Sequence, residues 1–242
     1  MGLVASSKIK RATEGMINSK TFADAYDETV SLLTSCAECE KSPFLKEGEG
    51  ETRIIIIAGD RGMAGGYNAN VFRLAAGYTD AVMIPIGKRA CDRFGSERIT
   101  AEHFNAEDSA ALAKKLCEDF AAGKFARLGI IKTEYVSIMT QNAVIEWVLP
   151  LKKNKDNKKI SVLFEPDELT VLNKAVPGYV AGRISTAVRE SYACEVAARR
   201  MAMDSAGKNA QQMIDDLTLK YNRVRQSAIT QEITEIVAGS GN

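Results

Sequence analysis

The stretch from Tyr179 to Ala238 most constrains how this chain can fold, because it is long and contains no proline. Apolar residues recur within it at alternating steps of four and three, at Ala210, Ile214, Leu217, Tyr221, Val224 and Ala228. This spacing is the 3.5-residue repeat of a coiled coil. At about 1.5 Å per residue the helix would be about 90 Å long, more than a compact domain of this size requires. We therefore expect a long C-terminal helix that needs a partner.

A second stripe with the same repeat opens the chain. Its members are Ala5, Ile9, Ala12, Met16, Ser19, Ala23, Tyr26, Val30, Leu33 and Ala37. We expect an N-terminal helix that ends near Ser42-Pro43, because proline disfavours a helical conformation in the residue before it. The two stripes together predict an antiparallel coiled coil. About 40 N-terminal residues would face about 60 C-terminal ones, so about 20 residues, roughly 30 Å of helix, would lack a partner.

Between the two stripes the pattern changes to alternating strands and helices. The β-branched run Arg53-Ile54-Ile55-Ile56-Ile57-Ala58 is typical of a buried parallel strand. We expect further strands at 81–86, 98–104 and 128–136, and helices at 69–77, 88–93 and 108–122, the last capped by Asp108-Ser109. This order predicts an α/β fold with a doubly wound, mostly parallel sheet inserted between the two coiled-coil helices.

The end of the inserted segment is read as a hairpin followed by a helix. Residues 144–151 and 160–164 flank a lysine-rich turn and look like a hairpin that leaves the sheet. A short helix begins at Glu165-Pro166 and ends near Ala175, where Pro177-Gly178 interrupts it. The expected parts are a coiled-coil helix at 1–45, an α/β domain at 46–176 and a second coiled-coil helix at 177–242.

Composition excludes several classes of function. The formal net charge is +1, so the balance gives no indication of a nucleic-acid partner. No apolar run approaches the roughly 18 residues of a membrane span. Five cysteines, an odd number scattered over the chain, favour a reducing compartment over a disulfide framework. His103 is the only histidine, which argues against histidine-based metal sites and Ser/His or Cys/His nucleophiles.

Three motifs invite a chemical interpretation. The loop Gly59–Asn68 follows a strand and precedes a helix, but it is neither G-x-G-x-x-G nor a P-loop, so a structural turn is favoured over nucleotide binding. Cys36-Ala37-Glu38-Cys39 has no second cysteine pair at metal spacing. The basic run Lys152–Lys159 lacks aromatic residues and reads as a solvated turn rather than a nucleic-acid patch.

Two stretches carry a resemblance to a known family. The loop GDRGMAGGYN, residues 59–68, resembles the SDRGLCGGxN signature of the gamma subunit of F-type ATP synthases. The run from Ala197 to Ser240 resembles the C-terminal signature of the same family almost throughout. Three departures stand out: the N-terminal helix begins later than in the family, because it is shortened or because Met1 is not the true start, Ala64 replaces a frequent cysteine, and the two-cysteine insertion of the plastid branch is absent. A bacterial member is therefore expected.

The resemblance implies a non-catalytic rotor stalk without a cofactor. Such a subunit couples transmembrane proton or sodium flow to ATP synthesis or hydrolysis by rotating inside the catalytic head. The implied partners are the alpha and beta subunits of the head, the epsilon subunit and the membrane c-ring, with no nucleic acid and no direct lipid insertion. The implied location is the cytoplasmic face of the bacterial cell membrane, as a peripheral protein. The alternative is an α/β nucleotide- or ligand-binding enzyme with helical dimerisation arms.

The resemblance also assigns residues, position by position. After Ala228 the apolar stripe shifts to a new face, and the implied catalytic-subunit contacts are Arg225, Gln226, Ile229, Thr230, Glu232 and Ile233. The implied membrane-ring contacts are Phe164, Glu165 and Val162. The signature loop comprises Gly59, Asp60, Arg61, Gly62, Gly65, Gly66 and Asn68, with Asp60 and Arg61 as a structural or subunit-contacting pair.

Overall fold

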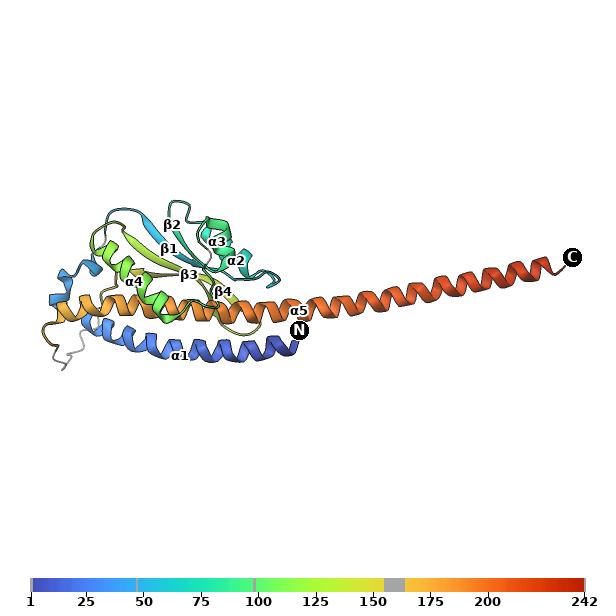
Figure 1. Cartoon of the computed structure of the whole chain (residues 1–242), viewed down its shortest axis with the longest axis horizontal. Coiled ribbons are helices and arrows are strands. Elements are labelled where there is room, and N and C mark those ends of the chain that lie inside the picture. Colours follow the sequence, from blue (N-terminus) through green and yellow to red (C-terminus); the bar gives the residue numbers. More distant parts are fainter. Residues whose placement is uncertain (1, 47, 98, 155–163, 242) are drawn as a thin grey trace. The chain divides into compact units, whose positions relative to one another are not determined.

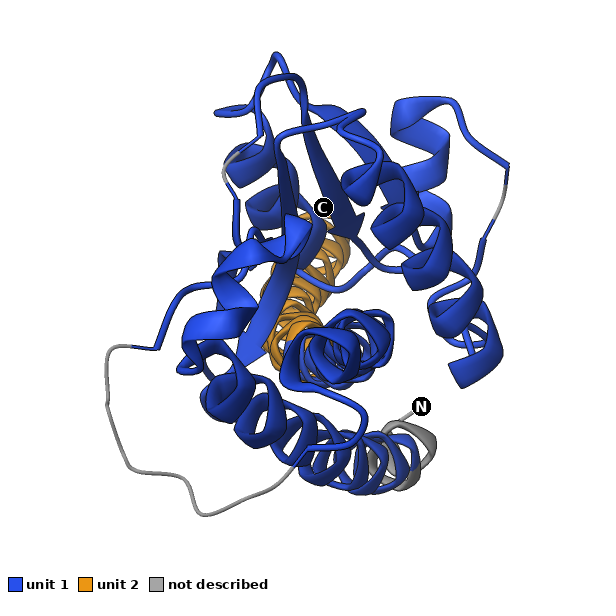
Figure 2. Ribbon diagram, turned by 90° about the vertical axis from the view of Figure 1, so that its left-hand side faces the viewer, with its two compact units in different colours: residues 1–201 blue, residues 202–242 orange. Residues whose placement is uncertain are grey.

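The computed structural model describes residues 2–46, 48–97, 99–154 and 164–241. The chain divides into two compact units, residues 1–201 and 202–242, which Figure 2 shows in different colours. Within the described residues no helix is both long enough and apolar enough to cross a membrane.

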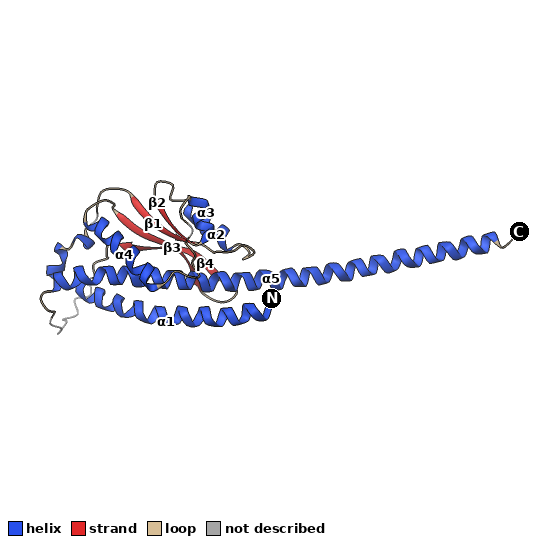
Figure 3. Cartoon of the chain, in the orientation of Figure 1, coloured by secondary structure: helices blue, strands red, loops and turns tan. Residues whose placement is uncertain are grey.

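The first unit contains a four-stranded sheet (Figures 1 and 3). Its strand order is β2-β1-β3-β4, in which β1 pairs in parallel with β2 and β3, and β4 runs antiparallel to β3. In this register Ile55 lies between Ile84 and Ile130. The strands are β1 (Thr52–Ile57), β2 (Val82–Ile86), β3 (Arg127–Tyr135) and β4 (Gln141–Leu149).

Helices cover both faces of the sheet, which confirms the predicted α/β architecture. The helices α2 (Tyr67–Ala75) and α3 (Lys88–Phe94) pack on Ile54 and Ile56. Ile55 and Ile57 point the other way, because successive side chains of a strand alternate between faces. There they share a core with α4 (Ala106–Ala121), α1 (Gly2–Thr34) and α5 (Glu168–Gly239). Burial on both faces explains why residues Ile54 to Ile57 of β1 form an unbroken apolar run.

The helices α1 and α5 pack in an antiparallel pair, as expected. Ser19, Ala23 and Tyr26 of α1 contact Thr186, Gly182 and Gly178 of α5, in that order, so one number falls as the other rises. The N-terminal stripe supplies the contact surface, since Ile9, Ala12, Ala23, Val30 and Leu33 are all buried. Ala37, its last predicted member, lies beyond the helix and is exposed.

The prediction that the N-terminal helix ends near Ser42-Pro43 is wrong, because α1 ends at Thr34. The Thr34 hydroxyl donates to the carbonyl of Ser31. The hydroxyl and the backbone N–H of Ser35 both donate to the carbonyl of Leu32. These bonds to the third preceding residue tighten the last turn and end the helix. Two short 3₁₀ helices follow, η1 (Ala37–Lys41) and η2 (Pro43–Leu45).

The predicted interruption at Pro177-Gly178 is also wrong, because α5 runs through Pro177 without a break. An interior proline costs about 3 kcal/mol. On either side of it α5 buries Leu172, Val176, Val180 and Ile184 completely. Each such side chain contributes about 1.5–3 kcal/mol, so their combined burial outweighs the proline.

Three further expectations need correction. The described part of residues 98–104 forms no strand, because the N–H groups of Ala101 and Glu102 donate to the Asp60 carboxylate instead of to a neighbouring strand. The cap of α4 is Asn105, which forms a capping box with Asp108. Residues 144–149 belong to β4 and pair with β3 inside the sheet. The second arm of the expected hairpin lies almost wholly outside the described residues.

The second unit contains the remainder of α5. Every described residue from 204 to 241 is exposed. The apolar stripe from Ala210 to Ala228 is therefore exposed too, with Leu217 and Val224 at 64% and 69%. In the first unit α1 packs instead on an earlier part of α5, around residues 176–189.

Candidate functional site

The glycine-containing signature loop follows β1 and lies against α5. A Cβ built on Gly59 would stand 2.8 Å from Cδ of Glu195, closer than real Cβ contacts allow. Only glycine fits at this position, because a side chain would displace the carboxylate. Gly59, two residues after the end of β1, thus leaves room for the Glu195 carboxylate of α5 against the loop.

Glu195 is almost completely buried, with 2% of its surface exposed. Its Oε1 accepts hydrogen bonds from the Arg199 guanidinium and, at 3.4 Å, from the backbone N–H of Arg61. Arg199 also donates to the carbonyl oxygens of Arg61 and Gly62, each at 3.3 Å. A buried carboxylate is stable only when it is paired and hydrogen-bonded, and Oε1 meets that requirement through Arg199 and the loop. The other oxygen, Oε2, is buried and has no hydrogen-bond partner among the described residues.

The Glu195 carboxylate makes this loop unfavourable for binding the phosphate of a nucleotide. In open α/β sheets, ligands bind beyond the carboxyl ends of the strands, where a phosphate lies against backbone N–H groups. Here the Glu195 carboxylate takes one such N–H, that of Arg61. A phosphate at the same place would meet a like charge. Nor do the described residues contain any group of three or more His, Cys, Asp or Glu side chains placed to hold a metal ion.

Asp60 and Asn68 fix the loop to its surroundings. The Asp60 carboxylate accepts backbone N–H groups from Lys88, Ala101 and Glu102 at 2.9–3.0 Å. Asn68 Oδ1 accepts the N–H of Gly59 at 2.9 Å. The loop is therefore bonded to the segments that follow β2 and precede α4.

The remaining signature residues lie at the surface or at the start of α2. Gly65 has a φ of +57°, Gly66 precedes the first turn of α2, and Gly62 is partly exposed. Arg61 points outward, 68% exposed, with its guanidinium 3.8 Å from Glu102.

A second buried polar contact joins the loop region to α5. Tyr67 Oη donates to the carbonyl of Ser191 at 3.0 Å, and Ser191 Oγ accepts the N–H of Thr133 in β3 at 3.1 Å. Burial raises the pKa of the Tyr67 hydroxyl, and the nearby Glu195 charge adds to that effect. The phenol therefore stays protonated and remains a hydrogen-bond donor.

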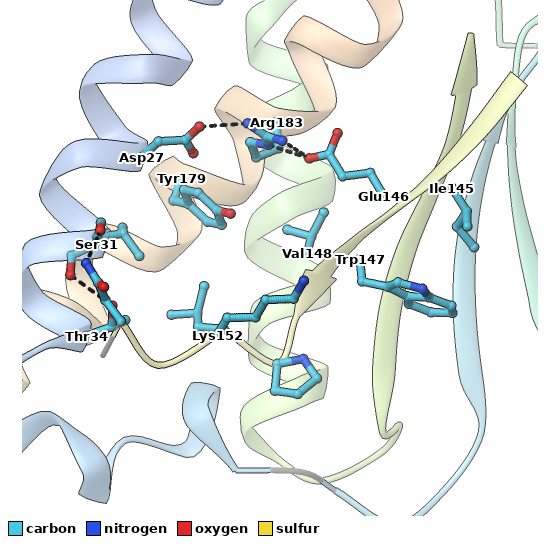
Figure 4. Close-up of a pocket in the computed structure, with 14 residues that line it drawn as sticks. Asp27, Ser31, Thr34, Ile145, Glu146, Trp147, Val148, Lys152, Tyr179 and Arg183 are labelled. Carbon is cyan, nitrogen blue, oxygen red and sulfur yellow. Dashed lines mark hydrogen bonds and ion pairs between the residues drawn. The ribbon is translucent and has the colours of Figure 1, made fainter. Parts of the chain in front are cut away.

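An ion-pair chain links the coiled coil to the sheet (Figure 4). Arg183 of α5 bridges Asp27 of α1, at 2.7 Å, and Glu146 of β4. Lys132 of β3 then contacts both Glu146, at 3.1 Å, and Glu190 of α5, at 2.9 Å. Asp27, Glu146 and Arg183 line a cavity of about 490 Å³. These ion pairs join α1 and α5 to β3 and β4 in one network.

Burial and neighbouring positive charges shift the pKa values of Asp27 and Glu146 in opposite directions. Burial raises the pKa of Asp27 even though Arg183 opposes the shift. Burial also raises the pKa of Glu146, but Lys132 and Arg183 outweigh it, so the net pKa is lowered. Glu146 is thus the carboxylate that the network stabilises in its ionised form.

The six expected catalytic-subunit contacts lie together on the second unit's part of α5. At about 100° per residue they fall within about 160° of the helix circumference. All are exposed, Ile229 at 46% and Ile233 at 56%. Thr230 Oγ1 donates to the carbonyl of Gln226 at 2.8 Å. In the described part of the chain, Arg225 and Glu232 form no ion pair.

The three expected membrane-ring contacts do not all fall on described residues. Phe164 is partly buried and packs against the main core, whereas Glu165 is exposed. Val162 and most of the lysine-rich run lie outside the described residues. Cys36 and Cys39 are free thiols on η1 and beside it, and burial raises the pKa of Cys39 to about 11.

Sequence reasoning missed Glu195, Arg199 and Arg183. A signal for the first two was present, because Glu195 stands in an apolar run, Ala193 to Ala198, with an arginine four residues later. A carboxylate inside such a run needs a partner, and the i, i+4 spacing supplies one. No comparable signal marks Arg183, because its partners come from α1 and β4.

Comparisons with known proteins agree with the predicted resemblance. A family model described as ATP synthase matches residues 1–241. The ATP synthase gamma chain of Ruminococcus albus is 35% identical over 260 residues, covering 100% of this chain and 91% of that protein. The gamma chain of Stenotrophomonas maltophilia is 35% identical over 259 residues, covering 98% and 90%.

Solved structures share the fold. The central stalk and c-ring structure of the Tetrahymena thermophila mitochondrial ATP synthase contains a chain with a TM-score of 0.64 and 19% identity, covering 86% of this chain and 97% of that one. A rotor chain of the Euglena gracilis enzyme has a TM-score of 0.56 and 18% identity, covering 94% and 98%. With the family match, these findings confirm the resemblance. The chain therefore belongs to the family of ATP synthase gamma chains, which are non-catalytic subunits of that enzyme.

Proposed function

We propose that this chain is the rotating shaft that couples ion flow to ATP synthesis or hydrolysis. The observation that carries the proposal is the exposed face of α5 formed by Arg225, Gln226, Ile229, Thr230, Glu232 and Ile233. It combines two opposite charges, two hydrogen-bonding side chains and two large apolar ones. Such a face suits a helix that is enclosed by other subunits.

Coupling requires contacts that differ between rotary positions. Arg225 and Glu232 can form charge-assisted hydrogen bonds with loops of the catalytic subunits in one position and lose them in the next. A contact shifts an equilibrium only when its free energy differs between two states. Rotation of an asymmetric helix would thus move three catalytic sites in turn through different nucleotide affinities.

Torque transmission needs a rigid connection between the globular domain and the helix pair. The Arg183 ion-pair chain and the Glu195–Arg199 pair support this role, because both link α5 to the sheet or to the loop that follows β1. We propose three functional parts, residues 1–45, 46–176 and 177–242, held together by these contacts.

The other partners follow from the family. Phe164 and Glu165, together with Val162, would contact the membrane c-ring, and the α/β domain would contact the epsilon subunit. The exposed Arg61 would reach a neighbouring subunit. Solved structures that share the fold are assemblies that contain the c-ring or the F1 head. The chain would then work as a peripheral protein at the cytoplasmic face of the cell membrane.

Reconstitution tests this proposal. The purified chain, added to a gamma-depleted ATP synthase complex, should restore ATP hydrolysis that drives proton or sodium transport, and should turn over no nucleotide alone. Turnover of a nucleotide by the isolated chain, without restored coupling, would instead favour an α/β enzyme with helical dimerisation arms.

A further inference from the structure

A cavity of about 220 Å³ lies between α1, α5 and the segment that precedes α4. The lining residues that carry charge or a hydroxyl are Lys8, Arg11, Glu102, Arg189 and Tyr192. All of them belong to the first unit. Neither Glu195 nor Arg183 lines this cavity, so it is separate from the Glu195–Arg199 pair and from the Arg183 ion pairs.

The single carboxylate in this lining is already engaged. Glu102 accepts hydrogen bonds from Lys8 Nζ at 3.3 Å and from Tyr192 Oη at 3.1 Å, and Arg61 lies 3.8 Å away. The backbone N–H of Glu102 donates to the Asp60 carboxylate. Burial and the Glu102 charge raise the pKa of Tyr192 to about 12, so this phenol remains a donor.

Arg11 and Arg189 have no hydrogen-bond or ion-pair partner in the described part of the chain. Arg189 Nη1 would lie 3.6 Å from a Cβ on Gly15, so the guanidinium rests over the glycine of the facing helix. The nearby acids pair with lysines instead: Glu14, about one turn from Arg11, with Lys10, and Glu190, next to Arg189, with Lys132. Three cations therefore face one carboxylate in the cavity, and two of them are unpaired.

We infer that this cavity binds a phosphate-type oxyanion. A guanidinium presents two parallel N–H donors that match two oxygens of such an anion, and two guanidiniums from facing helices can hold it from both sides. A concave surface with an excess of one charge also concentrates the field on its ligand. This inference does not depend on the proposed rotor function.

The test is a titration of the purified full chain with inorganic phosphate, at constant ionic strength set with chloride. The arginine Nε–Hε NMR signals of Arg11 and Arg189 should shift with one saturating curve. The double variant R11Q/R189Q should bind phosphate at least about tenfold more weakly and keep the same circular dichroism, because both side chains are exposed.

A matched control removes the same charge from the same two helices. Lys20 in α1 and Lys220 in α5 are exposed and line neither cavity described above. K20Q/K220Q should therefore leave phosphate binding unchanged. Equal loss in both double variants, or shifts that do not saturate, would overturn the inference in favour of non-specific charge screening.

Discussion

The carboxylate of Glu195 occupies the space that a side chain at position 59 would need, so it fits only because residue 59 is glycine. The Cβ that Gly59 lacks would lie 2.8 Å from Cδ and 2.9 Å from Oε1 of the Glu195 carboxylate. Gly59 follows the first strand, and Glu195 lies more than 130 positions later on α5. The signature loop thus packs around a buried carboxylate of α5.

Gly59→Ala should lower the free energy of unfolding by about 1–3 kcal/mol, the usual cost of overpacking a buried site. The measurement is urea unfolding of the first unit, monitored by the fluorescence of Trp147. Removing the carboxylate should relieve the clash, so G59A/E195A should cost less than the sum of the two single changes. Strict additivity would show that the two side-chain positions do not compete.

Two glycines of α5 provide a comparison at the interface with α1. A Cβ on Gly178 would lie 2.8 Å from the Tyr26 ring, whereas one on Gly182 would lie 3.7 Å from Phe22, an ordinary contact. Gly178→Ala should therefore destabilise the chain by about 1–3 kcal/mol. Gly182→Ala should be neutral or stabilise it by up to about 1 kcal/mol, because alanine favours the helix. Thermal unfolding of both variants checks the order, and the reverse order would contradict the packing.

The pH dependence of stability should identify Glu146. Its pKa is lowered from 4.5, with Lys132 and Arg183 outweighing burial, so its contribution is present above pH 4.5 and is lost as the pH falls through the lower folded value. Glu146→Gln should cost about 1.5–3 kcal/mol at pH 7, because the partly buried Lys132 and Arg183 each lose one of their two carboxylate partners. The gap between wild type and variant should shrink below pH 4.5.

Urea unfolding at several pH values between 3 and 7 measures that gap. Glu14→Gln is the control, since its pair with Lys10 is exposed and 4.0 Å long, and it should change stability little at any pH. A gap for Glu146→Gln that is constant across the range would contradict the assignment of the acid-sensitive contribution to this carboxylate.

The sequence predicted those features that arise from local periodicity. The heptad stripe of α1 and the β-branched run of β1 each bury residues at a fixed spacing, so both elements were found with their contact faces. The two long helices and the α/β insert followed from the same patterns. The family resemblance then supplied residues, such as Arg225, whose role no local pattern defines.

Features decided by long-range contacts could not be read from local signals. Pro177 and Gly178 signal a helix end, yet tertiary burial keeps α5 continuous and Gly178 serves the contact with Tyr26. Residues 99–104 have the composition of a strand, but Asp60, some 40 positions earlier, accepts two of their N–H groups. A side chain that replaces a strand neighbour leaves no periodic trace in the sequence.

In the proposed mechanism, one face of the α5 tip couples rotation to catalysis. On that face lie Arg225 and Glu232, whereas Gln231 and Glu235 lie on the opposite side and bond to each other at 3.0 Å. All four are exposed, so neither pair of alanine substitutions should alter the fold.

The decisive measurement is the number of protons or sodium ions transported per ATP hydrolysed in vesicles that carry the reconstituted complex. R225A/E232A should lower this ratio or the amount of assembled complex by at least about tenfold, because hydrogen bonds to charged groups contribute about 1.5–3 kcal/mol each. Q231A/E235A should leave both near wild type. Equal coupling in the two variants would contradict the claim that this face forms the rotor contact.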